Sequence, residues 1–388
     1  MAELQTLSLV NMLNSFRRFT QAFFTLSLSL PVLLTGCSHT ESVSMKLGEA
    51  QPVLKQAAKS IPINGQGRYL IGANYPWLRY GNDLGGSPES TDKNWATIAS
   101  DFSTMHKQGV EVVRFYLFAD GRSEPKFDAH GYVTGIGSMF LPDLDRLLKI
   151  ASDSKISLLL TLSDSSMFLA YPNPENHGGG HASIILENSV QQSFMTKALK
   201  PILVHIEQSP YRSNIVGIDL ENEPEGVTAG FYGSGGIGTA IMKAFLVEGA
   251  EYVHTYAKGV YVTVGSASPA WVSTWKGVGV DYYSAHYYPS MDGKDALAGS
   301  LPPGNGLPDY STLGLDRPCV LGEFPTNDTG YSAADKKHFS TLWYLDQIKK
   351  RGYAGALGWS YAVPDTASNW KKFAPTYHLW YKAHQANL

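Results

Sequence analysis

Two glutamates, Glu223 and Glu323, stand where short strand-like apolar runs end, and both could take part in acid–base or nucleophilic chemistry. Hydrolysis of a glycosidic bond with retention needs two carboxyl groups about 5 to 5.5 Å apart, one protonated to assist the leaving oxygen and one ionised to attack the anomeric carbon. Parallel strands in a closed barrel bring their carboxyl ends to one face. If both runs are such strands, the pair predicts glycoside hydrolysis.

Eight apolar runs supply the strands that would position these residues. They cover 69–74, 111–118, 156–162, 215–220, 260–265, 280–285, 318–322 and 355–360. Amphipathic helices are expected between them, over 94–108, 141–154, 190–208, 239–258 and 333–351, with room for only a short helix in 266–279. This alternation predicts an α/β fold, a (β/α)8 TIM barrel in a single domain with long loops on its C-terminal face.

The composition narrows the class of partner. A net charge of −3 without a clustered basic face argues against nucleic acid. The 22 tyrosines and 8 tryptophans suit a polysaccharide or oligosaccharide substrate, because sugar faces pack on aromatic rings and sugar hydroxyls bond to phenol and indole groups. We therefore expect a sugar partner and a monomer, with no cofactor and no metal required.

The N-terminus resembles an export signal. Arg17 and Arg18 precede an apolar run that ends in Leu-Thr-Gly-Cys at 34–37, which resembles the bacterial lipobox. The resemblance implies cleavage before Cys37 and lipidation of its sulfur, which would anchor the protein in the membrane. The alternative is an ordinary signal peptide with an incidental cysteine. A start at Met12 would place the arginine pair nearer the N-terminus.

These features predict three segments. Residues 1–36 are expected to be a lipoprotein signal peptide, residues 37–65 a lipidated tether without strong periodicity, and residues 66–388 the catalytic domain. The expected location is the bacterial cell envelope, lipid-anchored in the periplasm or at the outer membrane.

Several motifs occur in the order found in one enzyme family. The chain has Asn222-Glu223-Pro224 after the fourth run and Glu323 at the end of the seventh. It therefore resembles glycoside hydrolase family 5 and its clan A relatives, which implies Glu223 as the acid/base and Glu323 as the nucleophile. The resemblance covers residues 74–361. The further residues that match are Arg114 on the second strand, His286 and Tyr288 on the sixth, and Trp359 on the eighth.

The resemblance also implies a role for each matching residue. Arg114 should keep Glu323 ionised, and Tyr288 should hydrogen-bond that carboxylate while His286 orients the network. Asn222 should donate to the sugar 2-hydroxyl, and Trp359 should lie under the sugar that is cleaved. The negative charge of the nucleophile should raise the pKa of the acid/base.

One departure concerns the substrate. Many cellulase-like members have a histidine just after strand three, where this chain has Ser163-Asp164-Ser165. The segments 72–77, which ends in Trp77, and 114–122 are more similar to mannanase-like members. We expect a β-linked substrate, either β-mannan, β-glucan or an exopolysaccharide, with Trp77 among the residues that bind it.

Other interpretations remain open for these residues. The two glutamates could form a strand-end salt bridge, Arg114 could be a buried ion-pair partner, and Trp359 or His286 could belong to the core. Glu221 and Glu225, which flank the motif, are expected to make surface or loop contacts. A transglycosylase would use the same site, and a sugar-binding lipoprotein without activity is the alternative from another class.

Overall fold

The computed structural model of the protein describes residues 60–63, 66–88, 90–175, 177–229, 236–288, 306–327, 341–363 and 365–388. All of these belong to one compact unit that begins at Leu47. Cys37 and the expected signal peptide lie outside the described residues, as does most of the expected tether. Within the described part of the chain, no helix is both long and apolar enough to cross a membrane.

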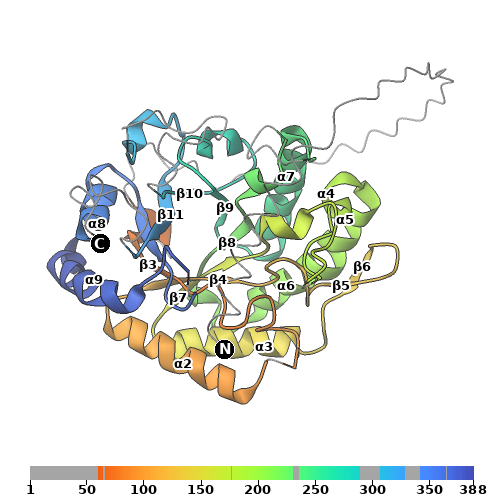
Figure 1. Ribbon diagram of the computed structural model, residues 1–388, viewed down its shortest axis with the longest axis horizontal. Helices are drawn as coiled ribbons and strands as arrows, with labels where there is room; N and C mark the ends of the chain where they lie inside the picture. Colours follow the sequence, from red (N-terminus) through yellow and green to blue (C-terminus); the bar gives the residue numbers. More distant parts are fainter. Residues whose placement is uncertain are drawn as a thin grey trace. The chain divides into compact units, whose positions relative to one another are not determined.

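Eight parallel strands close into a barrel, which confirms the predicted (β/α)8 fold (Figure 1). Each strand falls within or beside one of the eight apolar runs identified in the sequence. They are β3 (Leu70–Asn74), β4 (Val112–Tyr116), β7 (Ser157–Thr161), β8 (Ile215–Asn222), β9 (Val262–Ser266), β10 (Tyr283–His286), β11 (Cys319–Pro325) and β12 (Gly355–Trp359). The first and last of these pair in register, with Ala356 opposite Ile71, and this pairing closes the barrel.

The helices surround the strands and bury their apolar faces against the barrel. They are α2 (Asp92–Lys107), α3 (Phe140–Asp153), α4 (Ser183–Leu186), α5 (Asn188–Phe194), α6 (Lys200–Gln208), α7 (Thr239–Tyr256), α8 (Thr341–Lys350) and α9 (Trp370–His384). The helix expected over 190–208 consists of α5 and α6 joined by a π-helical segment, Met195–Leu199. Of the helix expected over 333–351, residues 333–340 lie outside the described residues. The fifth interval holds a short helix, Val272–Trp275, as expected.

A smaller apolar cluster fills the N-terminal end of the barrel. Val112, Leu159 and Val320 belong to it, together with Ile61 and Ile63. The two isoleucines come from β1 (Ile61–Ile63), which forms an antiparallel hairpin with β2 (Gln66–Arg68). Residues 61–63 therefore pack as part of the barrel domain, and the fold begins before the expected boundary at residue 66.

The next layer of the barrel interior is polar. Arg114 lies two residues after Val112 on β4, so both side chains face the same side of the strand. Arg114, Thr161 and Asp219 are all fully buried there. A buried charge is tolerated when it is paired and hydrogen-bonded, and this layer supplies the partners on which the site is built.

Candidate active site

The turn after β8 places Glu223 above the barrel. Glu223 has a left-handed backbone conformation, with φ 50° and ψ 57°, and Pro224 follows it. Its N–H donates to the carbonyl of Gly265 on β9 at 2.6 Å, which fixes the turn to the neighbouring strand. A residue other than glycine is uncommon in this region, and such conformations persist where the surrounding structure holds them, often at functional sites.

Glu225 fixes the same turn through hydrogen bonds to residues at and after the end of β9. One of its carboxylate oxygens accepts hydrogen bonds from Ser266 Oγ at 2.6 Å and Trp275 Nε1 at 2.7 Å. The other accepts from the N–H of Ala267 at 3.1 Å. Glu221 and Glu225 are both fully buried, so the surface contacts among the expectations are wrong, whereas each carboxylate does accept a hydrogen bond from a loop residue, Ser163 and Ala267 respectively.

Glu323 is held at both carboxylate oxygens. Arg114 Nη1 donates to Oε1 at 2.7 Å, and the Tyr288 hydroxyl donates to Oε2 at 2.7 Å. Only 5% of the Glu323 side chain is exposed. Both contacts were expected from the sequence. Because two donors face this carboxyl, its ionised form is favoured relative to that of a carboxyl without them.

Arg114 links the two halves of the site. Its Nε and Nη2 donate to one oxygen of Asp219 at 2.9 and 2.6 Å, and Nη2 also donates to Asn222 Oδ1 at 2.7 Å. Its Nη1 further donates to Asn74 Oδ1 at 3.1 Å. Asp219 and Asn74 were not predicted as site residues. Asp219 could have been found as an acid inside a buried strand, since such a group needs a charged partner.

His286 lies between the two glutamates. Its Nδ1 is 2.8 Å from Glu223 Oε1 and 3.5 Å from Glu323 Oε1. Burial lowers the pKa of His286 to about 4, so the ring is neutral near pH 7. The ligand atoms of the three residues lie within 4.8 Å of one another, a spacing that could also hold a metal ion. This separation is close to that of a nucleophile and an acid/base in a retaining glycosidase.

The two carboxyl groups differ in their surroundings. The pKa of Glu223 is raised to about 7, chiefly by burial and next by the negative charge of Asp164, while Arg114 opposes the shift. We expected Glu323 to supply that negative charge, whereas the neighbouring charge with the larger effect is that of Asp164. The pKa of Glu323 is also raised, because burial outweighs the opposing effects of His286 and Arg114. The sequence predicted the lowering by the arginine but not the larger effect of burial.

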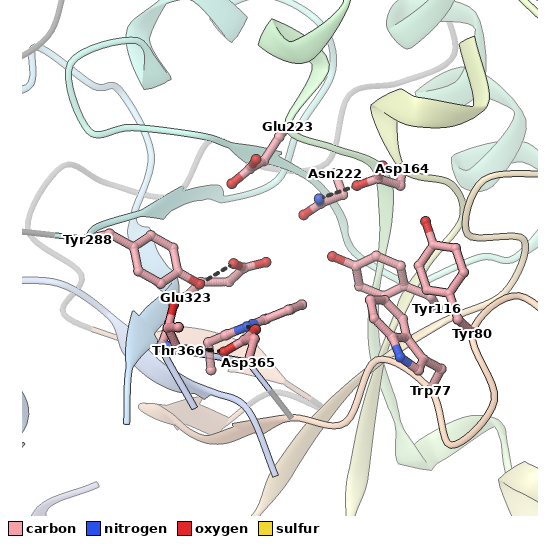
Figure 2. Close-up of a pocket in the computed structure, with 12 residues that line it drawn as sticks. Trp77, Tyr80, Tyr116, Asp164, Asn222, Glu223, Tyr288, Glu323, Asp365 and Thr366 are labelled. Carbon is pink, nitrogen blue, oxygen red and sulfur yellow. Dashed lines mark hydrogen bonds between the residues drawn. The ribbon is translucent and has the colours of Figure 1, made fainter. Parts of the chain in front are cut away.

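A cavity of about 430 Å³ opens above the carboxyl pair (Figure 2). Among the predicted residues, Trp77, Asn222, Tyr288 and Trp359 line it together with the two glutamates, whereas Arg114 and His286 lie behind its wall. Its other lining residues were not predicted, and they are Tyr80, Tyr116, Asp164, Asp365, Thr366 and Ala367. Most of these lie in loops after the strands, where no local pattern shows which side chain turns inward.

Two tryptophans form an aromatic wall of the cavity. The rings of Trp77 and Trp359 meet edge to face, with centroids 6.1 Å apart. Trp359 Nε1 donates to Asp365 Oδ2 at 2.7 Å, which fixes the plane of the indole. Because Trp359 is only partly buried and lines the cavity, its position favours contact with a ligand over a purely structural role in the core.

Replacement of Trp359 by alanine is therefore expected to weaken substrate handling more than folding. Loss of a stacking ring should raise the barrier in kcat/KM by about 1 to 3 kcal/mol, with a small change in melting temperature. Steady-state kinetics and a thermal melt on the same preparation measure both quantities. A large drop in melting temperature with normal activity per folded molecule would instead assign Trp359 to the core.

Comparisons with known proteins agree with the barrel. No protein-family model matches the chain. The mannan endo-1,4-β-mannosidase of Mytilus edulis is 27% identical over 342 residues, which cover 80% of this chain and 88% of that protein. The crystal structure of the β-mannanase from Mytilus edulis gives a TM-score of 0.67 at 24% identity and covers 82% of this chain and 93% of that one. An endo-1,4-β-mannanase from Eisenia fetida gives 0.68 at 21% identity, covering 85% and 93%.

Proposed function

We propose that this protein is an O-glycosyl hydrolase of the retaining class that cleaves β-1,4-linked mannan within the chain. The observation that carries the proposal is the carboxyl pair of Glu223 and Glu323, whose oxygens approach within 4.8 Å at the floor of an aromatic-lined cavity. The substrate class is supported by the relatives, which are named as mannanases acting on β-1,4 linkages. The segment Ser163-Asp164-Ser165, where many cellulase-like members have a histidine, agrees with this choice over β-glucan.

The proposed reaction is a double displacement. The Glu323 carboxylate attacks the anomeric carbon, and the proton of Glu223 passes to the departing glycosidic oxygen. The ionised Glu223 then takes a proton from water, which attacks the same carbon and releases Glu323. Asn222 lines the cavity, and its side-chain amide would donate to the 2-hydroxyl, a bond that strengthens as the ring approaches an oxocarbenium ion.

Hydrolysis of a polysaccharide panel by the purified full-length chain tests this function. We expect release of short β-1,4-mannooligosaccharides and a rapid fall in viscosity on mannan, with little release of reducing ends from cellulose or β-glucan. A Glu323→Gln preparation made in parallel excludes a contaminating glycosidase. Products longer than the substrate at high acceptor concentration would indicate a transglycosylase, and binding without turnover would indicate a sugar-binding protein.

The stereochemistry of the first product tests the mechanism. Two inversions at the anomeric carbon give net retention, so proton NMR read before mutarotation should show the β-anomer. The short separation of the two carboxyl groups leaves no room for a water molecule between Glu323 and the sugar. An α-anomer as first product would refute the mechanism even if both glutamates proved essential.

The pH dependence follows from the state of Glu223. The free enzyme needs Glu223 protonated, and its pKa is raised to about 7, so the active form is lost as pH rises through that value. We expect kcat/KM on mannan to fall about tenfold per pH unit above roughly pH 7. The measurement is a pH profile of kcat/KM, and a profile flat to pH 9 would contradict the assignment.

We also propose that the chain is a lipoprotein of the bacterial envelope, anchored through Cys37. We further propose that it is a monomer. The support is the lipobox-like sequence at 34–37, which lies outside the described residues. Metabolic labelling with radioactive palmitate should mark the wild type and not Cys37→Ser. Mass spectrometry of the mature N-terminus distinguishes lipidation from an ordinary signal-peptide cleavage.

A further inference from the structure

Asp164 is an acid in the cavity wall to which the proposed reaction assigns no role. It follows β7 and lies on the same side of the cavity as Asn222 and Glu223 (Figure 2). Its Oδ2 accepts a hydrogen bond from Asn222 Nδ2 at 2.6 Å. Its Oδ1 accepts from the N–H of Ser166 at 2.9 Å and from Ser166 Oγ at 2.5 Å. These contacts hold the carboxylate in one orientation beside the acid/base turn.

The amide of Asn222 is held at both ends. Arg114 Nη2 donates to its Oδ1, and its Nδ2 donates to Asp164, so the oxygen and nitrogen of the amide are each assigned a partner. A side-chain amide has two N–H donors, and Asp164 accepts from one of them. Because Asn222 lines the cavity, a ligand bound there could accept from the second N–H. Without Asp164, only the arginine contact would fix the plane of the amide.

Charged and titratable groups surround Glu223 on several elements of the barrel. They are Arg114 on β4, Asp164 after β7, Asp219, Glu221 and Glu225 on β8 and its turn, His286 and Tyr288 at β10, Glu323 on β11 and Asp365 after β12. Three of these groups are neutral or have other partners. Asp219 pairs with Arg114, His286 is neutral near pH 7, and Asp365 accepts from Trp359.

Glu221 and Glu225 face away from the cavity. Glu221 accepts from Ser163 Oγ, and Glu225 is bound by three donors around β9. Asp164, Glu323 and Asp365 line the cavity as negative groups, and among the charges around Glu223 it is Asp164 that raises its pKa most. Glu323 has its own cation in Arg114 at 2.7 Å, whereas the partners of Asp164 are neutral amide, hydroxyl and peptide groups.

We propose that Asp164 is a positioning residue, which fixes the Asn222 amide with one N–H toward the sugar and places a negative charge beside Glu223 that favours its protonated form. This inference rests on the proposed acid/base role of Glu223. A negative charge near a carboxyl raises its pKa, and Asp164 is the largest such charge effect on Glu223. One side chain can have both effects because Asn222, which Asp164 orients, is the neighbour of Glu223, whose pKa Asp164 raises.

Two variants remove the charge while keeping the local fold. Asp164 caps the short helix Ser165–Phe168 by accepting from the N–H of Ser166, and asparagine and serine are good residues at such caps. In Asp164→Asn and Asp164→Ser, the alkaline limb of kcat/KM on mannan should shift to lower pH by about half a pH unit or more. Asp164→Glu keeps the charge, so the alkaline limb of its kcat/KM profile should lie close to the wild-type pH.

A titration without substrate separates this proposal from the proposed function. Carbon-13 NMR of labelled carboxyl groups, with the Glu223 signal assigned by its loss in Glu223→Gln, should show the same downward shift in both variants. If the wild type fails to cleave mannan, the proposed function fails and the titration still decides the role of Asp164. At pH 5, Glu223 is protonated in each variant. A remaining loss of kcat/KM of roughly three- to tenfold in Asp164→Ser would then show the effect of losing the hydrogen bond that orients the Asn222 amide.

The matched control is Asp153→Asn on the exposed end of α3, which makes the same change in net charge beside Lys149. Its Glu223 midpoint should equal that of the wild type. An unchanged midpoint in both Asp164 variants overturns the proposal, and so does an equal shift in the control. If both variants fail to fold, Asp164 is a structural residue and the proposal is likewise wrong.

Discussion

Glu323→Gln is expected to abolish turnover on every glycoside while leaving the fold intact. The substitution removes the attacking charge with almost no change in volume. The glutamine oxygen can still accept from Arg114, and its N–H can donate to the Tyr288 hydroxyl, which can act as donor or acceptor. The arginine keeps its pairing with Asp219, so it is not left without an anion. We expect kcat to fall by at least about 10³-fold, measured on mannan and on an aryl β-mannoside.

Covalent trapping identifies the nucleophile independently of activity loss. A 2-fluoro β-mannosyl fluoride should label the wild type, with the added mass on the peptide that contains Glu323, because the fluorine slows release of the covalent intermediate. Glu323→Gln should remain unlabelled. Glu111→Gln is a suitable control. Glu111 is half-exposed, pairs with Arg68 and comes just before the N-terminal end of β4, at the end of the strand away from the active site. A label on a different residue, or substantial turnover by Glu323→Gln, would refute the assignment.

Glu223→Gln should instead produce a loss that depends on the leaving group. Mannan needs a proton on the departing oxygen, so its hydrolysis should fall by about 10²- to 10⁴-fold. The dinitrophenolate group of an aryl mannoside leaves without that proton. The first step should therefore survive and release a burst of dinitrophenol equal to the enzyme concentration. The second step should then stall, because glutamine cannot take a proton from water. Stopped-flow measurement of the phenol burst on the dinitrophenyl mannoside, together with the rate of reducing-end release from mannan, tests this directly.

Azide distinguishes a missing base from a damaged site. It needs no deprotonation, so it should release the trapped sugar from Glu223→Gln and form a β-mannosyl azide, with retention. Glu323→Gln serves as the comparison, since it should lose both steps on both substrates and should not respond in the same way. Equal loss on mannan and the aryl substrate, without rescue by azide, would remove Glu223 from the acid/base role.

The positions of Glu223 and Glu323 illustrate what local sequence can predict. Each ends a run of apolar residues, and a buried parallel strand is recognised from such a run within five to eight residues. Eight runs in order predict a barrel, and a barrel brings the carboxyl ends of its strands to one face. The approach of two glutamates 100 positions apart therefore followed from strand recognition and topology, without knowledge of any contact.

Other parts of the fold gave weaker local signals. Helix α9 contains Pro375 and several aromatic residues, a composition that does not favour a helix by itself, and it was not among the expected helices. The strand Ile61–Ile63 is only three residues long and was assigned to the tether. Both elements depend on burial against distant segments, since Ile61 packs with residues of the barrel and Phe373 of α9 packs against the ring of Phe324 on β11.

The sequence by itself determined the strands and the barrel, because these follow from short-range periodicity and from the order of the strands. The identity of the two candidate carboxyl residues also came from the sequence, through the resemblance of the motifs around Glu223 and Glu323 to those of a known family. The tertiary structure decided the environment of those carboxyl groups. Arg114 reaches Glu323 across 209 positions, and Asp164 reaches Asn222 across 58. The pKa of each acid is a sum of burial and of charges brought together by folding, and no segment of the chain contains that sum.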